Sequence, residues 1–297
     1  MKPSDGAGPS KRPDIAALIV NYNAGDELRR ALQSLVDELH HRAWEAVVVD
    51  NASADDSGRI AEEFAPRVRL IRNAENVGFG RGVNIALAAT TARHVLIMNP
   101  DCRLVAGALP VLQHELDVAP GCALVGPRIL SPDGTVQGTA RGDPDMLTGV
   151  FGRASALRKL LPNLAVSKRN VLDNTVTADD ASIVVDWVSG ACMLAHREAL
   201  ERVGGFDERY FLYWEDADLC RRLRGAGYHI RYVPAASAVH RVGQSSSTVR
   251  AMAIRAFHES AYLYYATHVA PAALHPKRPI AKALLAARCW WLLRNAT

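Results

Sequence analysis

The sequence predicts an α/β fold, in which a mostly parallel sheet carries helices on both faces. Short apolar runs suited to buried strands alternate with segments whose apolar residues recur at helical spacing. This alternation is typical of βαβ units, whose crossover connections make the strands run parallel. Polar residues follow directly after several predicted strands, at the edge where such sheets bind ligands. Two helical patterns end the chain, so we expect a C-terminal helical extension.

The first half of the chain is expected to supply most of the sheet. Apolar runs predict strands at residues 15–20, 46–49, 68–71, 94–98 and 123–126. Leucines at helical spacing predict a helix after the first strand: Leu28, Leu32, Leu35 and Leu39. Further helices are expected in the alanine-rich stretch that ends at Thr90 and over about 106–118. Ser53 with Asp56 resembles a capping box, which predicts a helix between the second and third strands.

The second half of the chain is less regular. The turn sequence Ser131-Pro-Asp-Gly134 predicts the tip of a hairpin. Residues 141–180 lack periodicity, so we expect a long loop or mobile segment, of the kind that often forms a lid. Strands are expected at 183–188, at 229–233, where Pro234 should end the strand, and at 238–240. Helices are expected over 196–202, after Glu215, over 250–269 and over 277–294.

The composition is that of a globular enzyme and excludes several classes of function. The 297 residues can form one large domain or two small ones, and 49% of them are hydrophobic and 22% charged. The net charge of +4 is mild and the basic residues are scattered, which is not typical of a nucleic-acid binder. The five cysteines are widely spaced without a CxxC pattern. They therefore indicate reduced thiols rather than a disulfide framework or a structural zinc site.

Polar residues at the predicted strand ends are the first candidates for a ligand site: Asn21, Asp50 and Asp101. Because Pro100 stops strand pairing, Asp101 should point out of the sheet. A lone aspartate in a turn is usually only a turn residue, but one or two carboxylates beside a substrate phosphate suit Mg²⁺ or Mn²⁺. His240, before a polar loop at 243–248, is a similar case. A single histidine there is more often structural, although the loop suits a flap over a phosphate.

The glycine stretch Gly78-Phe-Gly80-Arg-Gly82 does not match the dinucleotide-binding pattern GxGxxG. Val83 occupies the position where that pattern needs its third glycine, and the stretch does not follow the first strand. Two interpretations remain open. The glycines let the backbone approach a ligand, or they allow tight packing alone.

Three acids begin the helix that follows an aromatic run at 210–214: Glu215, Asp216 and Asp218. Acids in a first helical turn are ordinary, because they complement the helix dipole. Bulky aromatic residues directly before them could also exclude water from a carboxylate and raise its basicity, as a general base requires. This stretch alone leaves capping and catalysis equally open.

With these residues in place, the chain resembles the inverting glycosyltransferases of family 2, which have the GT-A fold with its Rossmann-like sheet. The resemblance covers roughly residues 15–265 and rests on six motifs in the family's order: 19–23, 48–53, 76–84, 99–101, 187–191 and 205–219. The motifs at 99–101 and 206–219 are most similar to those of bacterial rhamnosyltransferases. Those enzymes build O-antigen, cell-wall linker or related surface glycans.

The resemblance implies a role for each candidate residue. Asp216 would be the catalytic base and Glu215 its neighbour, while Asp218 keeps the ordinary interpretation of a first-turn acid. Asp101 and His240 would bind a divalent cation, Mg²⁺ or Mn²⁺, at the diphosphate; Asn99 replaces the first acid of the Asp-x-Asp pattern of many relatives and supplies no charge. The implied nucleotide and donor residues are Asn21, Asn23, Asp50, Asn51, Asn76, Gly78, Gly82, Asn84 and Asn99. The implied sugar and acceptor residues are Trp187, Ser189, Gly190 and Trp214.

The resemblance also implies a reaction and its partners. A sugar, L-rhamnose from dTDP-rhamnose by analogy with the rhamnosyltransferases, would pass with inversion to a hydroxyl of a glycan or a polyprenyl-diphosphate-linked acceptor. The first alternative is a UDP-sugar donor carrying galactofuranose, glucose or N-acetylglucosamine. A nucleotidyltransferase fits less well, because the first strand ends in Asn21-Tyr-Asn23 rather than a basic glycine-rich motif. A non-catalytic sugar-binding module would not need both Asp101 and Asp216.

Three regions are expected along the chain: a disordered tail at 1–13, a GT-A catalytic domain at 14–249 and a helical segment at 250–297. The last helix has an apolar stripe, Ile280, Leu284, Ala287 and Trp291, among lysines and arginines. It could lie on an anionic membrane surface or pack on the catalytic domain, and both remain open. The N-terminus has no apolar core, and no apolar run reaches the roughly 18–20 residues that span a bilayer. We therefore expect a cytoplasmic protein, with or without contact with the inner membrane.

Overall fold

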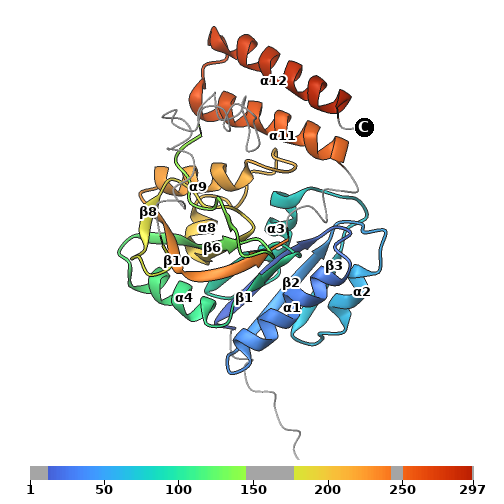
Figure 1. Ribbon diagram of the computed structural model, residues 1–297, viewed down its shortest axis with the longest axis vertical. Coiled ribbons are helices and arrows are strands. Elements are labelled where there is room, and N and C mark those ends of the chain that lie inside the picture. Colours follow the sequence, from blue (N-terminus) through green and yellow to red (C-terminus); the bar gives the residue numbers. More distant parts are fainter. Residues whose placement is uncertain (1–12, 145–176, 242–249, 296–297) are drawn as a thin grey trace, which may run out of the picture.

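The computed structural model describes residues 13–144, 177–241 and 250–295 (Figure 1). The predictions for the N-terminal tail, for most of the segment 141–180 and for the polar loop at 243–248 concern residues outside these ranges. Within them, a ten-stranded mixed sheet forms the centre of the molecule, with the strand order β3-β2-β1-β4-β9-β6-β10-β5. Two short strands lie beside this path, β7 on β6 and β8 on β10.

The elements of the first half run from the first strand to the hairpin. They are β1 (Ile15–Asn21), α1 (Asp26–Leu39), β2 (Trp44–Asp50), α2 (Ser57–Glu62), β3 (Val68–Arg72), α3 (Phe79–Ala88), β4 (His94–Met98), β5 (Cys102–Leu104), α4 (Ala108–Val118), β6 (Cys122–Leu130) and β7 (Val136–Gln137). The predicted parallel pairing is confirmed for β1 with β2, β1 with β4 and β2 with β3. The predicted hairpin is confirmed too, since β6 and β7 pair antiparallel.

The elements of the second half complete the sheet and add the terminal helices. They are β8 (Ile183–Val185), β9 (Cys192–His196), α8 (Arg197–Arg202), α9 (Glu215–Gly225), β10 (His229–His240), α11 (Arg250–Tyr264), the π-helix η2 (Tyr265–Val269) and α12 (Lys277–Arg294). The predicted helices are all present. In Figure 1, α11 and α12 lie as a pair beyond α9, away from the sheet.

The sheet separates two hydrophobic layers. Alternate residues of β1 point to opposite faces, so Leu18 joins one layer and Ile19 the other. Side chains of α1, α2 and α4 fill the layer that contains Ile19. Side chains of α3, α8, α9 and α11 fill the layer that contains Leu18. The continuous apolar runs of the sequence are explained by this double burial, because a strand covered on both faces needs no polar side.

Three expectations about the elements are wrong in detail. The strand β10 does not end at Pro234 but continues to His240, because a register shift between Val233 and Ser237 places the proline where no ladder hydrogen bond is required. Strand β9 was not expected, and it runs antiparallel between β4 and β6. Ser53 does not cap α2: the helix starts at Ser57 without a side-chain cap, and the Ser53 hydroxyl accepts a hydrogen bond from the Asn23 backbone instead.

The last helix, α12, packs against α11 through one narrow face. Ala281 and Leu285 are buried there. The apolar stripe predicted from the sequence lies on a neighbouring, exposed face, where Ile280 is 57% exposed and Trp291 58% exposed. Among the described residues, no helix is both long enough and apolar enough to cross a bilayer.

Candidate active site

The ends of the parallel strands β1 and β2 form one wall of the candidate site. Asn21 and Asp50 are neighbours in the sheet register, and both are buried. The Asn21 amide donates to the Asp50 carboxylate at 2.7 Å and to the Ser57 hydroxyl at 2.8 Å. The Asn21 side-chain oxygen is buried without a partner among the described residues. An unpaired buried acceptor is costly, so this wall suits a ligand that can donate a hydrogen bond.

A second group of asparagines holds the start of α3 against this wall. The Asn51 amide donates to the Gly78 carbonyl oxygen at 3.0 Å and to the Asn76 side-chain oxygen at 3.2 Å. Asn76 in turn accepts from the Gly78 backbone at 3.0 Å. Asn23 accepts from the Ala54 backbone at 2.7 Å, which joins the loops after β1 and β2. These side chains are occupied in fixing the loops, so they would shape a nucleotide pocket mainly through backbone positions.

Asp101 and His240 lie close together, Asp101 in the turn between β4 and β5 and His240 at the end of β10. The antiparallel pairing of β5 with β10 aligns Cys102 with His240, which brings the two side chains together across 139 positions of sequence. The His240 Nε2 atom lies 3.2 Å from an Asp101 carboxylate oxygen. The Asn99 amide nitrogen lies 3.3 Å from the same Nε2 atom. Asp101 is only 6% exposed, so this carboxylate and imidazole face each other in a largely enclosed space.

Gln137, which the sequence did not single out, fixes the orientation of His240. Its side-chain nitrogen donates to the His240 carbonyl oxygen at 2.7 Å, and its side-chain oxygen lies 3.1 Å from His240 Nδ1. These two contacts hold the ring so that Nε2 faces Asp101. Histidines that bind metals are usually held this way. Asp101 and His240 offer a carboxylate oxygen and an imidazole nitrogen, and both are donor types that bind divalent cations such as Mn²⁺.

Asp216 lies at the start of α9, buried against the loop before β9. One of its carboxylate oxygens accepts a hydrogen bond from the Gly190 backbone at 2.9 Å, and the other accepts from the Ala217 backbone at 2.9 Å. Glu215 is also buried, 5% exposed. The Asn99 backbone donates to the Ala191 carbonyl oxygen at 2.9 Å. The loop at 189–191 thus contacts both the turn that leads to Asp101 and the start of α9 that carries Asp216.

The turn before Asp216 has an unusual backbone. Tyr213 and Trp214 both have left-handed conformations, with φ of 69° and 71°. For non-glycine residues such a conformation costs on the order of 1–3 kcal/mol each and is typical of functional sites. The indole of Trp214 is buried between α11 side chains, and its Nε1 atom has no partner among the described residues.

Two buried side chains near this turn, Cys220 of α9 and Tyr264 of α11, have raised pKa values. Burial raises the pKa of the Cys220 thiol to about 12, and burial likewise raises the pKa of the Tyr264 hydroxyl to about 12. Both groups therefore stay protonated at neutral pH. Cys220 is therefore not a thiolate nucleophile.

Several predicted site residues also have structural contacts. Gly82 lies against β1: a β-carbon there would lie 2.8 Å from the Val20 side chain. The Asn84 side-chain nitrogen donates to the Phe206 carbonyl oxygen at 2.9 Å, and the Asn84 side-chain oxygen accepts from the Phe206 backbone N–H at 2.9 Å. The Trp187 indole donates to the Gly142 carbonyl oxygen at 2.9 Å. For Gly78 and Gly82 the packing interpretation is favoured, since a β-carbon at Gly78 would lie 2.4 Å from the Phe211 carbonyl oxygen.

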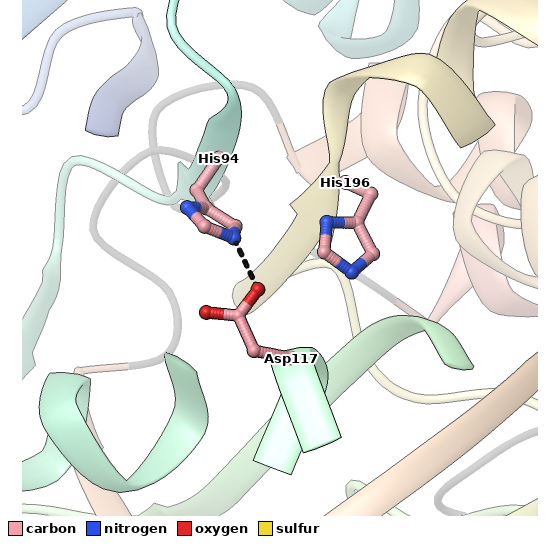
Figure 2. Close-up of side chains that lie close together, drawn as sticks. All are labelled: His94, Asp117 and His196. Atoms are coloured by element: carbon pink, nitrogen blue, oxygen red, sulfur yellow. Dashed lines mark hydrogen bonds and ion pairs between the residues drawn. The ribbon is translucent and has the colours of Figure 1, made fainter. Parts of the chain in front are cut away.

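A separate cluster of metal-binding residue types lies at the opposite end of β4. His94 and His196 are paired across β4 and β9, and Asp117, in the last turn of α4, points toward His94 (Figure 2). A strand rise of roughly 3.3 Å per residue puts His94 about 16 Å from Asn99. Three of the four ring nitrogens have protein partners: Asp117 lies 2.9 Å from His94 Nε2, Gln113 lies 3.3 Å from His94 Nδ1, and the Leu116 carbonyl oxygen lies 3.2 Å from His196 Nε2. Burial and the neighbouring His94 lower the pKa of His196, which favours the neutral form of that imidazole.

Comparison with known proteins identifies relatives over most of the chain. The family model "Glycosyl transferase family 2" matches residues 16–204. An N-acetylglucosaminyl-diphospho-decaprenol L-rhamnosyltransferase of Mycobacterium tuberculosis is 32% identical over 263 residues, which cover 85% of this chain and 84% of the relative. The rhamnosyltransferase WbbL of Escherichia coli is 27% identical over 262 residues, 85% of this chain and 92% of the relative.

Solved structures agree on the fold. The mannosyltransferase PcManGT of Pyrobaculum calidifontis, crystallised with GDP-mannose and Mn²⁺, superimposes with a TM-score of 0.56 at 20% identity. The match covers 99% of this chain and 79% of that protein. The expected α/β architecture of the GT-A type is thereby confirmed.

Proposed function

The chain belongs to glycosyl transferase family 2 and is a glycosyltransferase, and from this premise we propose that it transfers L-rhamnose from dTDP-rhamnose to a lipid-linked glycan acceptor. The observation that carries the proposal is the connection of two groups through one loop. The Asp101–His240 pair and Asp216 lie on either side of residues 189–191, bonded through Asn99 and Gly190. The rhamnose donor and the polyprenyl-diphosphate acceptor are supported by the names of the mycobacterial and E. coli relatives.

The proposed reaction gives each group a separate task. An acceptor hydroxyl attacks the anomeric carbon as the diphosphate departs, and Asp216 takes the hydroxyl proton. Its two backbone hydrogen bonds hold the carboxylate in place and leave lone pairs for the incoming proton. A divalent cation held by Asp101 and His240 would neutralise charge on the diphosphate. Asn21 and Asp50 would bind the nucleotide at the strand ends.

The donor is tested by thermal unfolding with a panel of nucleotide sugars. We expect dTDP-rhamnose with Mn²⁺ to raise the melting temperature most, because a ligand that binds only the folded state stabilises it by about 2.7 kcal/mol at a hundredfold excess over Kd. UDP-glucose, UDP-galactofuranose and UDP-N-acetylglucosamine serve as controls. A rise with UDP-sugars alone would assign the donor to that class and contradict dTDP-rhamnose.

We also propose that the exposed face of α12 contacts the membrane that carries the acceptor. This outer face consists of Ile280, Leu284, Trp290 and Trp291, all exposed. Lys277 and Lys282 are exposed beside it, and the Arg294 guanidinium lies 4.3 Å from the Trp290 ring centre. Apolar and aromatic side chains among cations are typical of helices that lie in the interface of anionic bilayers.

Vesicle flotation tests this contact. The full chain is expected to float with vesicles that contain phosphatidylglycerol and to remain behind with pure phosphatidylcholine. The double variant Trp290→Ser/Trp291→Ser should lose most of this binding, whereas Val118→Ser, on the distant helix α4 and 57% exposed, should not. Equal flotation of both variants would contradict the membrane contact, and concentration-dependent association without vesicles would assign the face to a second copy of the chain.

A further inference from the structure

The segment 211–214, which leads into Asp216, is held from two sides. On one side its Phe211 carbonyl oxygen accepts a hydrogen bond from the Phe79 backbone at 2.9 Å, at the start of α3. On the other side α11 covers it. The Ser260 hydroxyl donates to the Leu212 carbonyl oxygen at 3.0 Å. The segment therefore joins the proposed nucleotide wall to the C-terminal helices, which Figure 1 shows beyond α9.

Aromatic side chains of α11 enclose the two left-handed residues. The Phe257 ring centre lies 5.9 Å from that of Tyr213 and 5.8 Å from that of Trp214. The Tyr264 ring centre lies 5.3 Å from that of Trp214. Because a strained backbone persists only where its surroundings over-determine it, these contacts explain how Tyr213 and Trp214 keep their conformation directly before Glu215 and Asp216.

A second set of contacts fixes α9 itself to the same C-terminal helices. Asp218 is fully buried; it accepts from Arg222 at 2.7 Å, and its other oxygen lies 2.6 Å from His268 Nε2 in η2. Arg221 donates to the His268 carbonyl oxygen at 3.2 Å. Asp218 is thus more than a first-turn helix acid. It ties the catalytic helix to the end of α11.

We propose that α11 and η2 position the catalytic base, with Phe257, Ser260 and His268 as positioning residues that set where Asp216 lies. This inference rests on the proposed function of Asp216. The helices themselves supply no atom to the reaction, because their contacts reach the turn and the buried side of α9. The Arg288 guanidinium of α12 lies 5.6 Å from the Phe257 ring centre, so the outermost helix contacts the same positioning residue.

The test compares kcat with donor affinity in purified full-length variants. Phe257→Ala is expected to lower kcat by about 10²-fold, the cost of a displacement near 1 Å at a reacting group, while the Kd for the nucleotide sugar stays unchanged. Phe257→Tyr keeps the ring and should restore most of kcat. Met252→Ala is the matched control, since Met252 lies on the exposed side of the same helix. Should Phe257→Ala not fold, Ser260→Ala removes only the hydrogen bond to Leu212 and should lower kcat by about 10-fold.

Four outcomes separate this inference from the role of Asp216. Loss of donor binding in parallel with kcat, or an effect of Phe257→Ala no larger than that of Met252→Ala, overturns the positioning role. Normal kcat in Phe257→Ala beside an inactive Asp216→Asn overturns the positioning role alone. Full activity of Asp216→Asn overturns the role of Asp216 as the base and, with it, the positioning role.

Discussion

Replacing Asp216 by asparagine is expected to lower kcat by about 10²–10⁴-fold, the usual contribution of a general base. The substitution keeps the size of the side chain and its acceptor for the Gly190 backbone, so the fold should persist. Because Asp216 lies across the 189–191 loop from Asp101 and His240, nucleotide-sugar binding should be unchanged. Steady-state kinetics and calorimetric titration of the donor measure the two quantities separately.

Two further variants make this result specific. Glu215→Gln removes the neighbouring buried acid and should have a smaller effect on kcat than Asp216→Asn. Glu198→Gln changes an exposed acid in the first turn of α8, and it should leave kcat unchanged. A larger loss in Glu215→Gln than in Asp216→Asn would transfer the role of the base to Glu215.

Replacing Asp101 by asparagine is expected to lower kcat/KM by about 10²–10³-fold, because charge stabilisation by a bound cation contributes several kcal/mol and each 1.36 kcal/mol is a factor of ten. Unlike the Asp216 variant, this one should also weaken Mn²⁺ binding. Gln137→Leu should weaken Mn²⁺ by about 10–100-fold, since Gln137 only orients His240. Titration of Mn²⁺ followed by electron paramagnetic resonance measures both effects without relying on activity.

The cluster of His94, Asp117 and His196 supplies a control for the prediction that Asp101 binds the cation. Asp117→Asn alters the carboxylate beside His94, far from the strand ends, and should leave Mn²⁺ affinity and kcat/KM unchanged. Normal Mn²⁺ affinity in Asp101→Asn, or its loss in Asp117→Asn, would place the cation elsewhere than at Asp101.

The parallel half of the fold could be predicted from the sequence because its signals are local. Strand β1 is buried on both faces and reads as a continuous apolar run, and the leucines of α1 recur at helical spacing. Strand β9 pairs antiparallel with β4 and β6, far from it in the sequence, and such pairing leaves no local pattern. The continuation of β10 past Pro234 depends on a register shift, which is a property of the paired strands and leaves no local pattern.

In the candidate site, too, some residues have a local sequence signal and others do not. Asn21, Asp50 and Asp101 could be singled out because each follows a strand, and the topology then gathers such residues at one edge. Gln137 and Phe257 could not. Gln137 reaches His240 across 103 positions, and Phe257 contacts Trp214 from a helix that follows the whole sheet. Residues that orient others are chosen by packing in the folded state, so neither spacing nor residue type marks them beforehand.

The half of the fold that would bind the nucleotide is continuous in sequence, yet it cannot be excised as an independent unit. Four adjacent strands, β3-β2-β1-β4, come from residues 15–98. The outer edge of β4 is paired only by β9, which supplies residues 192–196. A fragment that stops earlier would expose a row of unpaired backbone groups along an apolar strand, a template for edge-to-edge aggregation. The shortest fragment with this edge protected therefore extends through His196.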